Sequence, residues 1–207
     1  MSHTLRTTCR FCNDRFDPLL DLGPIVPSDF LRPDQPDPPA MPLALVACRS
    51  CGLVQLDRTA DPEGMFRQYW YRSGVNEVMR AELQDIVEKA ERLVGGFASS
   101  DIVLDIGAND GTLLSNIKGP VRVAFEPAFN LITQLRQHAE AVYNQFFPLK
   151  GVVGERSIKA VFSIAMFYDL DDPRAFVEEI DRVLSDDCVW VVQFQDLAQM
   201  VETTAFD

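Results

Sequence analysis

The chain has 207 residues, of which 47% are hydrophobic and 10% aromatic, enough to build one large domain or two small ones. Its formal charge of −12 argues against nucleic acid as a partner, because the chain lacks the summed positive field that attracts a phosphate backbone. The start has no apolar signal-peptide region, and no apolar run approaches the roughly 20 residues of a membrane helix. We therefore expect a cytoplasmic protein that makes no membrane contact.

Two cysteine pairs with the same spacing open the chain, Cys9-x-x-Cys12 and Cys48-x-x-Cys51. Two such turns can complete a tetrahedron of thiolates, which is the geometry of a structural zinc site with no open position. A redox pair or unpaired core thiols are the alternatives, but a redox C-x-x-C normally precedes a helix. The fifth cysteine, Cys188, stands alone in a strand-like run, and we expect it to be a small core residue.

The segment between the cysteine pairs is rich in proline, with seven of the chain's 13 prolines at positions 22–42. Proline at this density resists helix and central strand, so we expect few strands here. Such a region buries little apolar surface by itself and needs an additional stabilising element, such as a structural metal. Residues 1–60 are therefore predicted to form a small zinc-binding domain.

The next segment, residues 61–98, is predicted to be a helical linker that includes an aromatic stretch. Residues 61–74 suggest a short helix that runs into the aromatic loop "YWYRSG". Residues 76–96 have an apolar face at spacings of three and four, typical of an amphipathic helix. That face comprises Met79, Leu83, Ile86, Val87, Ala90, Leu93 and Val94.

From residue 99 to residue 207 the chain alternates apolar strands with helices. The strands are expected at 101–107, 121–127, 141–146, 160–166 and 188–194, with helices at 110–118, 128–140 and 172–184. This alternation predicts an α/β domain with a parallel, Rossmann-like sheet of about five strands, covered on both faces. His138 is expected on the solvent side of its helix.

The first of these strands ends in "VLDIGANDG" (103–111), where glycines let a ligand approach the backbone. Glu126 follows the second strand, and its two oxygens can accept both hydroxyls of a ribose. Dinucleotide and S-adenosylmethionine sites share this pattern. Asp105 and Asp110 would repel a pyrophosphate but suit an ammonium and a sulfonium, and Asn109 replaces the glycine of the dinucleotide motif. We therefore favour S-adenosylmethionine, with NAD or a ligand-free turn as alternatives.

The order of these motifs resembles that of the nucleotide-sugar C-methyltransferases, which are class I enzymes with an N-terminal zinc domain. The resemblance rests on "CRFC", "CRSC", "YWYRSG", "DIGANDGTLL", "FEP" and "SIAMFYDLDDP", and runs from about residue 9 to the last residue. It implies methylation of a carbon of a nucleotide-linked keto-deoxysugar, with S-adenosylmethionine as donor. A base would remove the acidified proton, and the resulting enolate would attack the methyl group.

The resemblance also implies roles for individual residues. Zinc would be held by Cys9, Cys12, Cys48 and Cys51. The cofactor would be held by Asp105, Gly107, Ala108, Asn109, Asp110, Gly111, Thr112, Glu126, Pro127, Ala165 and Met166. The candidate catalytic residues are Tyr69, Tyr71 and Ser73, which resemble a loop that covers the methyl-donor pocket; packing at a helix end is their alternative role.

In that family a further segment, which begins with a His-Glu-His-x-x-Tyr-Tyr motif, is thought to supply the base and substrate contacts. This chain has only His3 and His138. We therefore expect a sheet truncated after its fifth strand, with a missing C-terminal half or another chain covering that strand. Two other functions stay open: a non-catalytic module that binds S-adenosylmethionine or a partner, and a methyltransferase with an oxygen or nitrogen acceptor.

Overall fold

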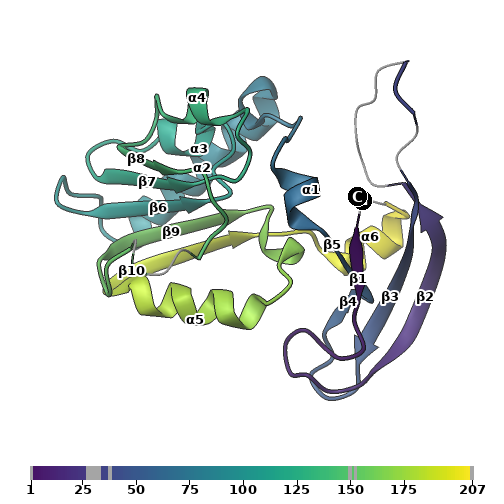
Figure 1. The fold of residues 1–207 in the computed structure, drawn as a ribbon. Helices are drawn as coiled ribbons and strands as arrows, with labels where there is room; N and C mark the ends of the chain where they lie inside the picture. The colour runs from purple at the N-terminus through teal and green to yellow at the C-terminus, as the bar shows by residue number, and fades with distance from the viewer. Residues whose placement is uncertain (1, 27–33, 37–38, 149–150, 152, 206–207) are drawn as a thin grey trace. The chain divides into compact units, whose positions relative to one another are not determined.

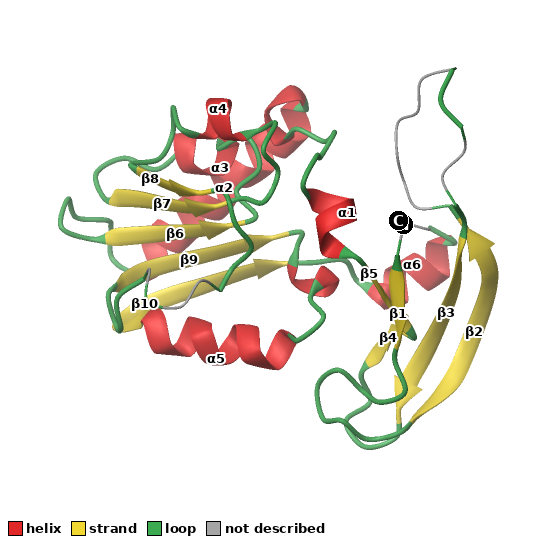
Figure 2. Cartoon of the chain, viewed as in Figure 1, coloured by secondary structure: helices red, strands yellow, loops and turns green. Residues whose placement is uncertain are grey.

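The structure is a computed structural model that describes residues 2–26, 34–36, 39–148, 151 and 153–205. Contacts divide the chain into two compact units, Met1–Tyr71 with Asp171–Ala175, and Arg72–Leu170 with Phe176–Asp207. Figure 1 follows the chain through both units, and Figure 2 shows their helices and strands. In the part of the chain that is described, no helix has the length and apolar character needed to cross a membrane.

The first unit is built from antiparallel strands and one short helix. A three-stranded sheet has the order β2-β3-β4, and a separate ribbon pairs β1 with β5. The elements are β1 (His3–Leu5), β2 (Phe16–Ile25), β3 (Met41–Cys48), β4 (Val54–Leu56), β5 (Arg58–Ala60) and α1 (Pro62–Phe66).

The strand β2 contradicts the expectation that this proline-rich region is poor in strands. It runs for ten residues and includes Pro18 and Pro24. Among the strands described, its partner is β3, so β2 lies at a sheet edge, where a residue without an N–H is tolerated. Its register shifts after Pro18 and again before Pro24. Residues 27–33 and 37–38 of the proline-rich segment lie outside the described part.

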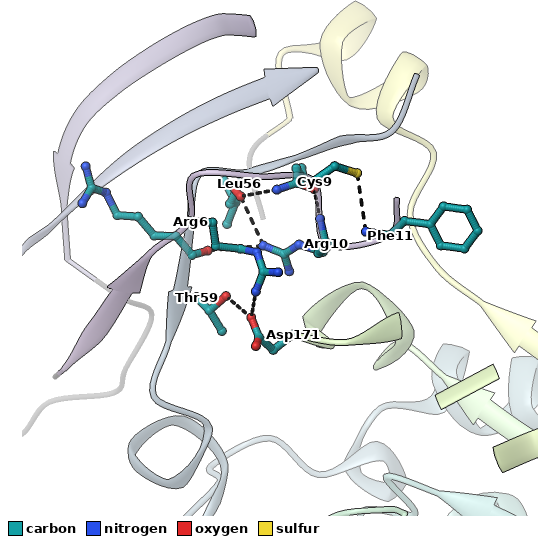
Figure 3. Close-up of polar contacts among 9 residues, drawn as sticks. Arg6, Cys9, Arg10, Phe11, Leu56, Thr59 and Asp171 are labelled. Carbon is teal, nitrogen blue, oxygen red and sulfur yellow. Dashed lines mark hydrogen bonds and ion pairs between the residues drawn. The ribbon is translucent and has the colours of Figure 1, made fainter. Parts of the chain in front are cut away.

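Two half-buried arginines, Arg6 and Arg10, tie the first unit together (Figure 3). The Arg10 guanidinium donates to the Leu56 carbonyl oxygen at 3.1 Å and so connects the first cysteine turn to β4. Arg6 forms an ion pair with the Oδ1 atom of Asp171. The same oxygen accepts a hydrogen bond from the Thr59 hydroxyl at 2.5 Å. These contacts attach the short segment Asp171–Ala175 to the β1–β5 ribbon.

The second unit is an α/β fold with a parallel five-stranded sheet in the order β10-β9-β6-β7-β8. The strands are β6 (Ile102–Ile106), β7 (Val121–Phe125), β8 (Ala141–Tyr143), β9 (Ile158–Ile164) and β10 (Leu184–Gln193). The predicted fold class, an α/β domain with a parallel, Rossmann-like sheet of about five strands, is thereby confirmed. Within the described residues β10 pairs with β9 alone; that a further segment or chain covers β10 stays a prediction.

Helices cover both faces of this sheet, as Figure 1 shows. On one face α2 (Glu77–Leu93), α3 (Thr112–Ser115) and α4 (Ile132–Leu135) pack over alternate strand residues such as Val103. On the other face α5 (Pro173–Val183) packs over the intervening residues such as Leu104. The Asp172 side chain caps α5 by accepting the Ala175 N–H at 3.0 Å.

Several local expectations differ from the structure. The helices α3 and α4 have only four residues each. Longer helices were predicted at 110–118 and 128–140, but the chain continues there in turns. Leu93 ends α2 with 76% of its surface exposed, and Cys188 is half-buried in β10, so neither is a core residue. The remaining elements are two 3₁₀ turns, η1 (Ser73–Val75) and η2 (Phe167–Asp169), and the helix α6 (Leu197–Thr203).

Candidate functional site

The two cysteine turns bring four sulfur atoms within 4.8 Å of one another. Cys9 and Cys51 lie 3.7 Å apart and Cys12 and Cys48 3.3 Å apart, too far for disulfides and close to the roughly 3.8 Å edge of a zinc–thiolate tetrahedron. All four cysteines are free, so each can supply a thiolate. The first unit therefore contains a four-cysteine site that fits zinc.

Backbone amides around the sulfurs favour the charged form of the ligands. The Phe11 N–H donates to the Cys9 sulfur at 3.4 Å. N–H groups of Cys51 and Ser50 donate to the Cys48 sulfur and lower the pKa of that thiol to about 6. Thiolates are the form that binds metal, so these amides favour a cation at Cys9 and Cys48. The neighbouring thiols have the opposite effect on the other two cysteines: against the Asp14 amide, the hydrogen bond with Cys48 raises the pKa of Cys12 to about 12, and the pKa of Cys51 is raised as well.

The second candidate site lies at the carboxyl ends of β6 and β7. The loop after β6 turns sharply because Gly107 and Gly111 have φ angles of 73° and 85°, and Asn109 one of 52°. The N–H groups of Gly107 and Ala108 both donate to the Phe125 carbonyl oxygen, at 2.9 and 3.1 Å. The loop is thus held against the end of β7, where Glu126 follows.

Glu126 joins the loops that follow the two strands. One carboxylate oxygen accepts the Asn109 N–H at 2.7 Å, and the other accepts the Ala128 N–H, also at 2.7 Å. The side chain is only 5% exposed. Asn144 supports this corner by donating to the carbonyl oxygens of Glu126 and Pro127 at 2.8 and 2.9 Å. Two of the roughly four acceptor positions of a carboxylate are used, which leaves two for a diol.

Asp105, near the end of β6, is a fully buried acid beside Glu126. Burial, followed by the negative charge of Glu126, raises the pKa of Asp105 to about 8. Burial also raises the pKa of Glu126, although two amides favour its ionised form. Asp105 is therefore neutral at pH 7 in this structure, in contrast to the expectation that it contributes a negative charge. A cation placed beside it would lower its pKa.

The side chains of Asn109 and Asp110 are directed to the turn η1. Asn109 accepts the Ser73 N–H at 3.0 Å, and Asp110 accepts the Gly74 N–H at 2.9 Å. Thr112, also predicted to contact the cofactor, donates its hydroxyl to Asp110 at 2.6 Å. Ser73 is thus brought to the loop through its backbone N–H.

The other predicted site residues divide between the two units. Met166 lies against Gly107, since a Cβ there would meet the Met166 Cγ at 3.3 Å. Ala165 has a φ of 52° and donates its N–H to the Gln193 carbonyl oxygen. Tyr69 and Tyr71 belong to the first unit, where both rings contact Trp70 at 5.9 Å between centroids.

Three neighbours of the loop were missed from the sequence. Gly74 is the last residue of the motif "YWYRSG" but was assigned no role, and Asn144 follows a short strand. His138 is half-buried and lies over Gly111, where an added Cβ would be 3.1 Å from its Cβ and Cδ2 atoms, so its expected position on the solvent side is wrong. The signal at Gly74 was its place in that motif, and at Asn144 it was the residue type alone, which is common in turns.

Residues 9–66 match a methyltransferase-associated family described as "Putative zinc binding domain". The match spans all four cysteines and ends with α1. Together with the sulfur geometry, it makes the first unit a zinc-binding domain. No curated protein matches the chain.

Among solved structures, the chain is similar to a SAM dependent methyltransferase from Aquifex aeolicus (18% identity; 57% of this chain and 68% of the other; TM-score 0.44). A second match is a methyltransferase from Haloferax volcanii, solved in complex with the Trm112 activator (20%; 57% and 55%; 0.46). A third is the plantazolicin methyltransferase BpumL in complex with SAH (11%; 62% and 52%; 0.49). The chain thus spans little more than half the length of the last two, and no inference about ligand or activity follows from likeness at this level.

The four-cysteine site predicts how the protein responds to loss of one ligand. Protein purified without added zinc should contain about one equivalent of the metal, and Cys12→Ser should lose most of it, because three thiolates bind zinc less tightly than four. The matched control is Cys188→Ser, which should keep the full equivalent. Metal analysis by mass spectrometry measures both. A folded, metal-free wild type, or equal zinc content in the two variants, would contradict the assignment.

The raised pKa of Asp105 predicts a pH dependence of stability. Between its ordinary value of 3.8 and its native value of about 8, the native protein keeps a proton that the unfolded chain releases. The free energy of unfolding therefore falls as the pH rises from about 5 to about 8. The stabilisation that the protonated Asp105 contributes is fully present only below the unfolded pKa.

Asp105→Asn removes the titrating group, so the free energy of unfolding of this variant should fall less than that of the wild type between about pH 5 and pH 8. Urea unfolding followed by circular dichroism at several pH values measures the slope. Asp186→Asn is the control, since the Asp186 side chain is 90% exposed and should leave the wild-type slope unchanged. Identical slopes for wild type and Asp105→Asn would contradict the assigned protonation state.

Proposed function

We propose that the second unit binds S-adenosylmethionine at the carboxyl ends of β6 and β7 and that the protein is a methyltransferase. The observation that carries the proposal is the buried pair of carboxyl groups, Asp105 and Glu126, beside a sharp loop in which Gly107 and Gly111 adopt positive φ angles. The zinc-binding unit supports it, because its family is associated with methyltransferases. S-Adenosylmethionine would supply an electrophilic methyl group on a sulfonium.

The residues present fit such a ligand on two counts. Glu126 retains acceptor positions after binding the Asn109 and Ala128 amides, and a vicinal diol can occupy them. Asp105 has a raised pKa and would become ionised beside a cation, which an ammonium or sulfonium supplies. A pyrophosphate would instead add negative charge next to Glu126. This difference favours S-adenosylmethionine over NAD.

We propose further that the acceptor is a keto-deoxysugar carried on a nucleotide and that a carbon is methylated. The support is the resemblance in motif order, from the two cysteine turns through "YWYRSG" and "DIGANDGTLL" to "FEP". Tyr69, Tyr71 and Ser73 remain the candidate catalytic residues, on the resemblance of their loop to one that covers the methyl-donor pocket. A methyltransferase with an oxygen or nitrogen acceptor, and a module that binds the donor without turnover, are the competing functions.

Titration calorimetry tests the cofactor. S-Adenosylmethionine should bind with a Kd below about 100 µM, and Glu126→Gln should weaken binding about tenfold or more, because it loses a charged acceptor for two hydroxyls. Glu91→Gln, an exposed change on α2, is the control and should bind as the wild type does. Absence of binding to the wild type at millimolar ligand would refute the proposal, and binding of NAD instead would favour the dinucleotide alternative.

A transfer assay tests the acceptor. With a 4-keto nucleotide sugar and labelled S-adenosylmethionine, the proposal expects label in a non-exchangeable methyl group on carbon, which NMR of the product identifies. Tyr71→Phe should lower turnover without changing the Kd of the donor, if the hydroxyl acts on the acceptor. Label on oxygen or nitrogen would overturn the C-methyl assignment, and donor binding without any transfer would favour the non-catalytic module.

A further inference from the structure

The turn η1 is fastened to the loop after β6 by two hydrogen bonds from consecutive backbone amides. Ser73 donates its N–H to the Asn109 side-chain oxygen at 3.0 Å, and Gly74 donates its N–H to Asp110 at 2.9 Å. The residues of this contact are 36 positions apart in the chain and belong to the same compact unit. The contact therefore closes a long loop that contains the whole of α2 and β6.

Asp110 is the centre of this contact. Its carboxylate is 1% exposed, and its second oxygen accepts the N–H of Thr112 at 3.2 Å and the Thr112 hydroxyl at 2.6 Å. A buried carboxylate requires such donors, because burying its charge without them is strongly unfavourable. Its hydrogen bonds to N–H and O–H groups are charge-assisted and stronger than neutral ones. Both oxygens are thus engaged within the protein, one by the turn and one by the loop.

The position of Gly74 has no room for a side chain. A Cβ on Gly74 would lie 2.7 Å from the Thr112 hydroxyl oxygen and 2.9 Å from the Asp110 oxygen that accepts its N–H. Both distances are too short for a carbon atom beside oxygen, so only glycine lets the amide reach Asp110. On the other side, Arg80 donates from its guanidinium to the Gly74 carbonyl oxygen at 2.7 Å. The turn is held from both sides.

We propose that Asn109 and Asp110 are positioning residues, whose side chains fasten the Ser73–Val75 turn to the loop, and that they do not contact the cofactor. Asn109 reinforces the arrangement, since its side-chain oxygen also accepts the Asp110 N–H at 2.9 Å. Because the Asn109 N–H is bound to Glu126, the turn, the loop and the end of β7 form one connected network. Occupation of the loop by a ligand should therefore stabilise the turn, and the fastened turn should in return favour the ligand.

Trypsin cleavage after Arg72 tests the fastening in the ligand-free full-length chain. Arg72 is exposed, and the residues that follow it are held by Asn109 and Asp110, so cleavage requires the turn to open. Asp110→Asn and Gly74→Ala should raise the rate of this cleavage about tenfold, because each removes a hydrogen bond of a buried charge. Cleavage after the exposed Lys118 in the same digest reports general loosening and should change less than twofold.

Matched variants separate the side-chain contacts from a general defect. Asn109→Asp keeps an acceptor for Ser73 and should stay protected, whereas Asn109→Gly allows the same backbone but lacks the acceptor and should be cut faster. Ser73→Ala keeps its N–H and should stay protected. Wild-type rates in both Asp110→Asn and Asn109→Gly, or equal increases after Arg72 and Lys118, would overturn the proposal.

The coupling to the cofactor rests on the proposed function and is measured separately. S-Adenosylmethionine should slow cleavage after Arg72 in the wild type, and Asp110→Asn should bind it about tenfold more weakly while keeping the wild-type pH dependence of binding. A wild type that fails to bind S-adenosylmethionine but is protected at Arg72 would overturn the cofactor assignment and support the fastening. Weaker binding in Asp110→Asn with unchanged Arg72 protection would show direct contact and overturn the fastening.

Discussion

The buried carboxylate of Glu126 is the interaction on which the ligand end of the sheet depends. It receives one N–H from the loop after β6 and one from the loop after β7, so it determines how the two loops lie. A charge in this position is tolerated because two hydrogen bonds compensate its loss of water. Burial first, and then the charge of Glu126, raises the pKa of Asp105 to about 8, which favours its protonated form at pH 7. This balance of charge supports the proposed binding of a cationic ligand.

The first unit solves a different problem, which is how a small, proline-rich segment holds a fixed shape. Leu19, Leu20 and Leu22 of β2 are exposed, so this strand contributes little to a core. The sulfur atoms of four cysteines instead meet at one point, and a zinc ion there would replace the missing apolar burial. The Arg10 guanidinium extends this centre to the β4 backbone. A bound metal together with the half-buried Arg10 would thus take the place of a hydrophobic core.

The sequence predicted most features that depend on a repeating pattern. The apolar face of α2, the parallel strands and the cysteine tetrahedron were all expected, because periodicity and spacing are local properties. It did not predict that β2 passes through Pro18 and Pro24, since edge position is a property of the sheet. The short helices α3 and α4 were missed for a related reason: their apolar residues are buried by neighbouring strands whether or not the helix continues.

What the sequence by itself determined is the inventory: four thiolates at matching spacing, an acid at each of two strand ends, and glycines that allow a sharp loop. What only the tertiary structure decided is which partner each polar group has. Asp110 and Asn109 bind a turn 36 residues earlier in the chain, and Asp105 is neutral because it is buried beside Glu126. Hydrogen bonds and pKa values depend on distance and solvent access in three dimensions, which no local pattern of residues contains.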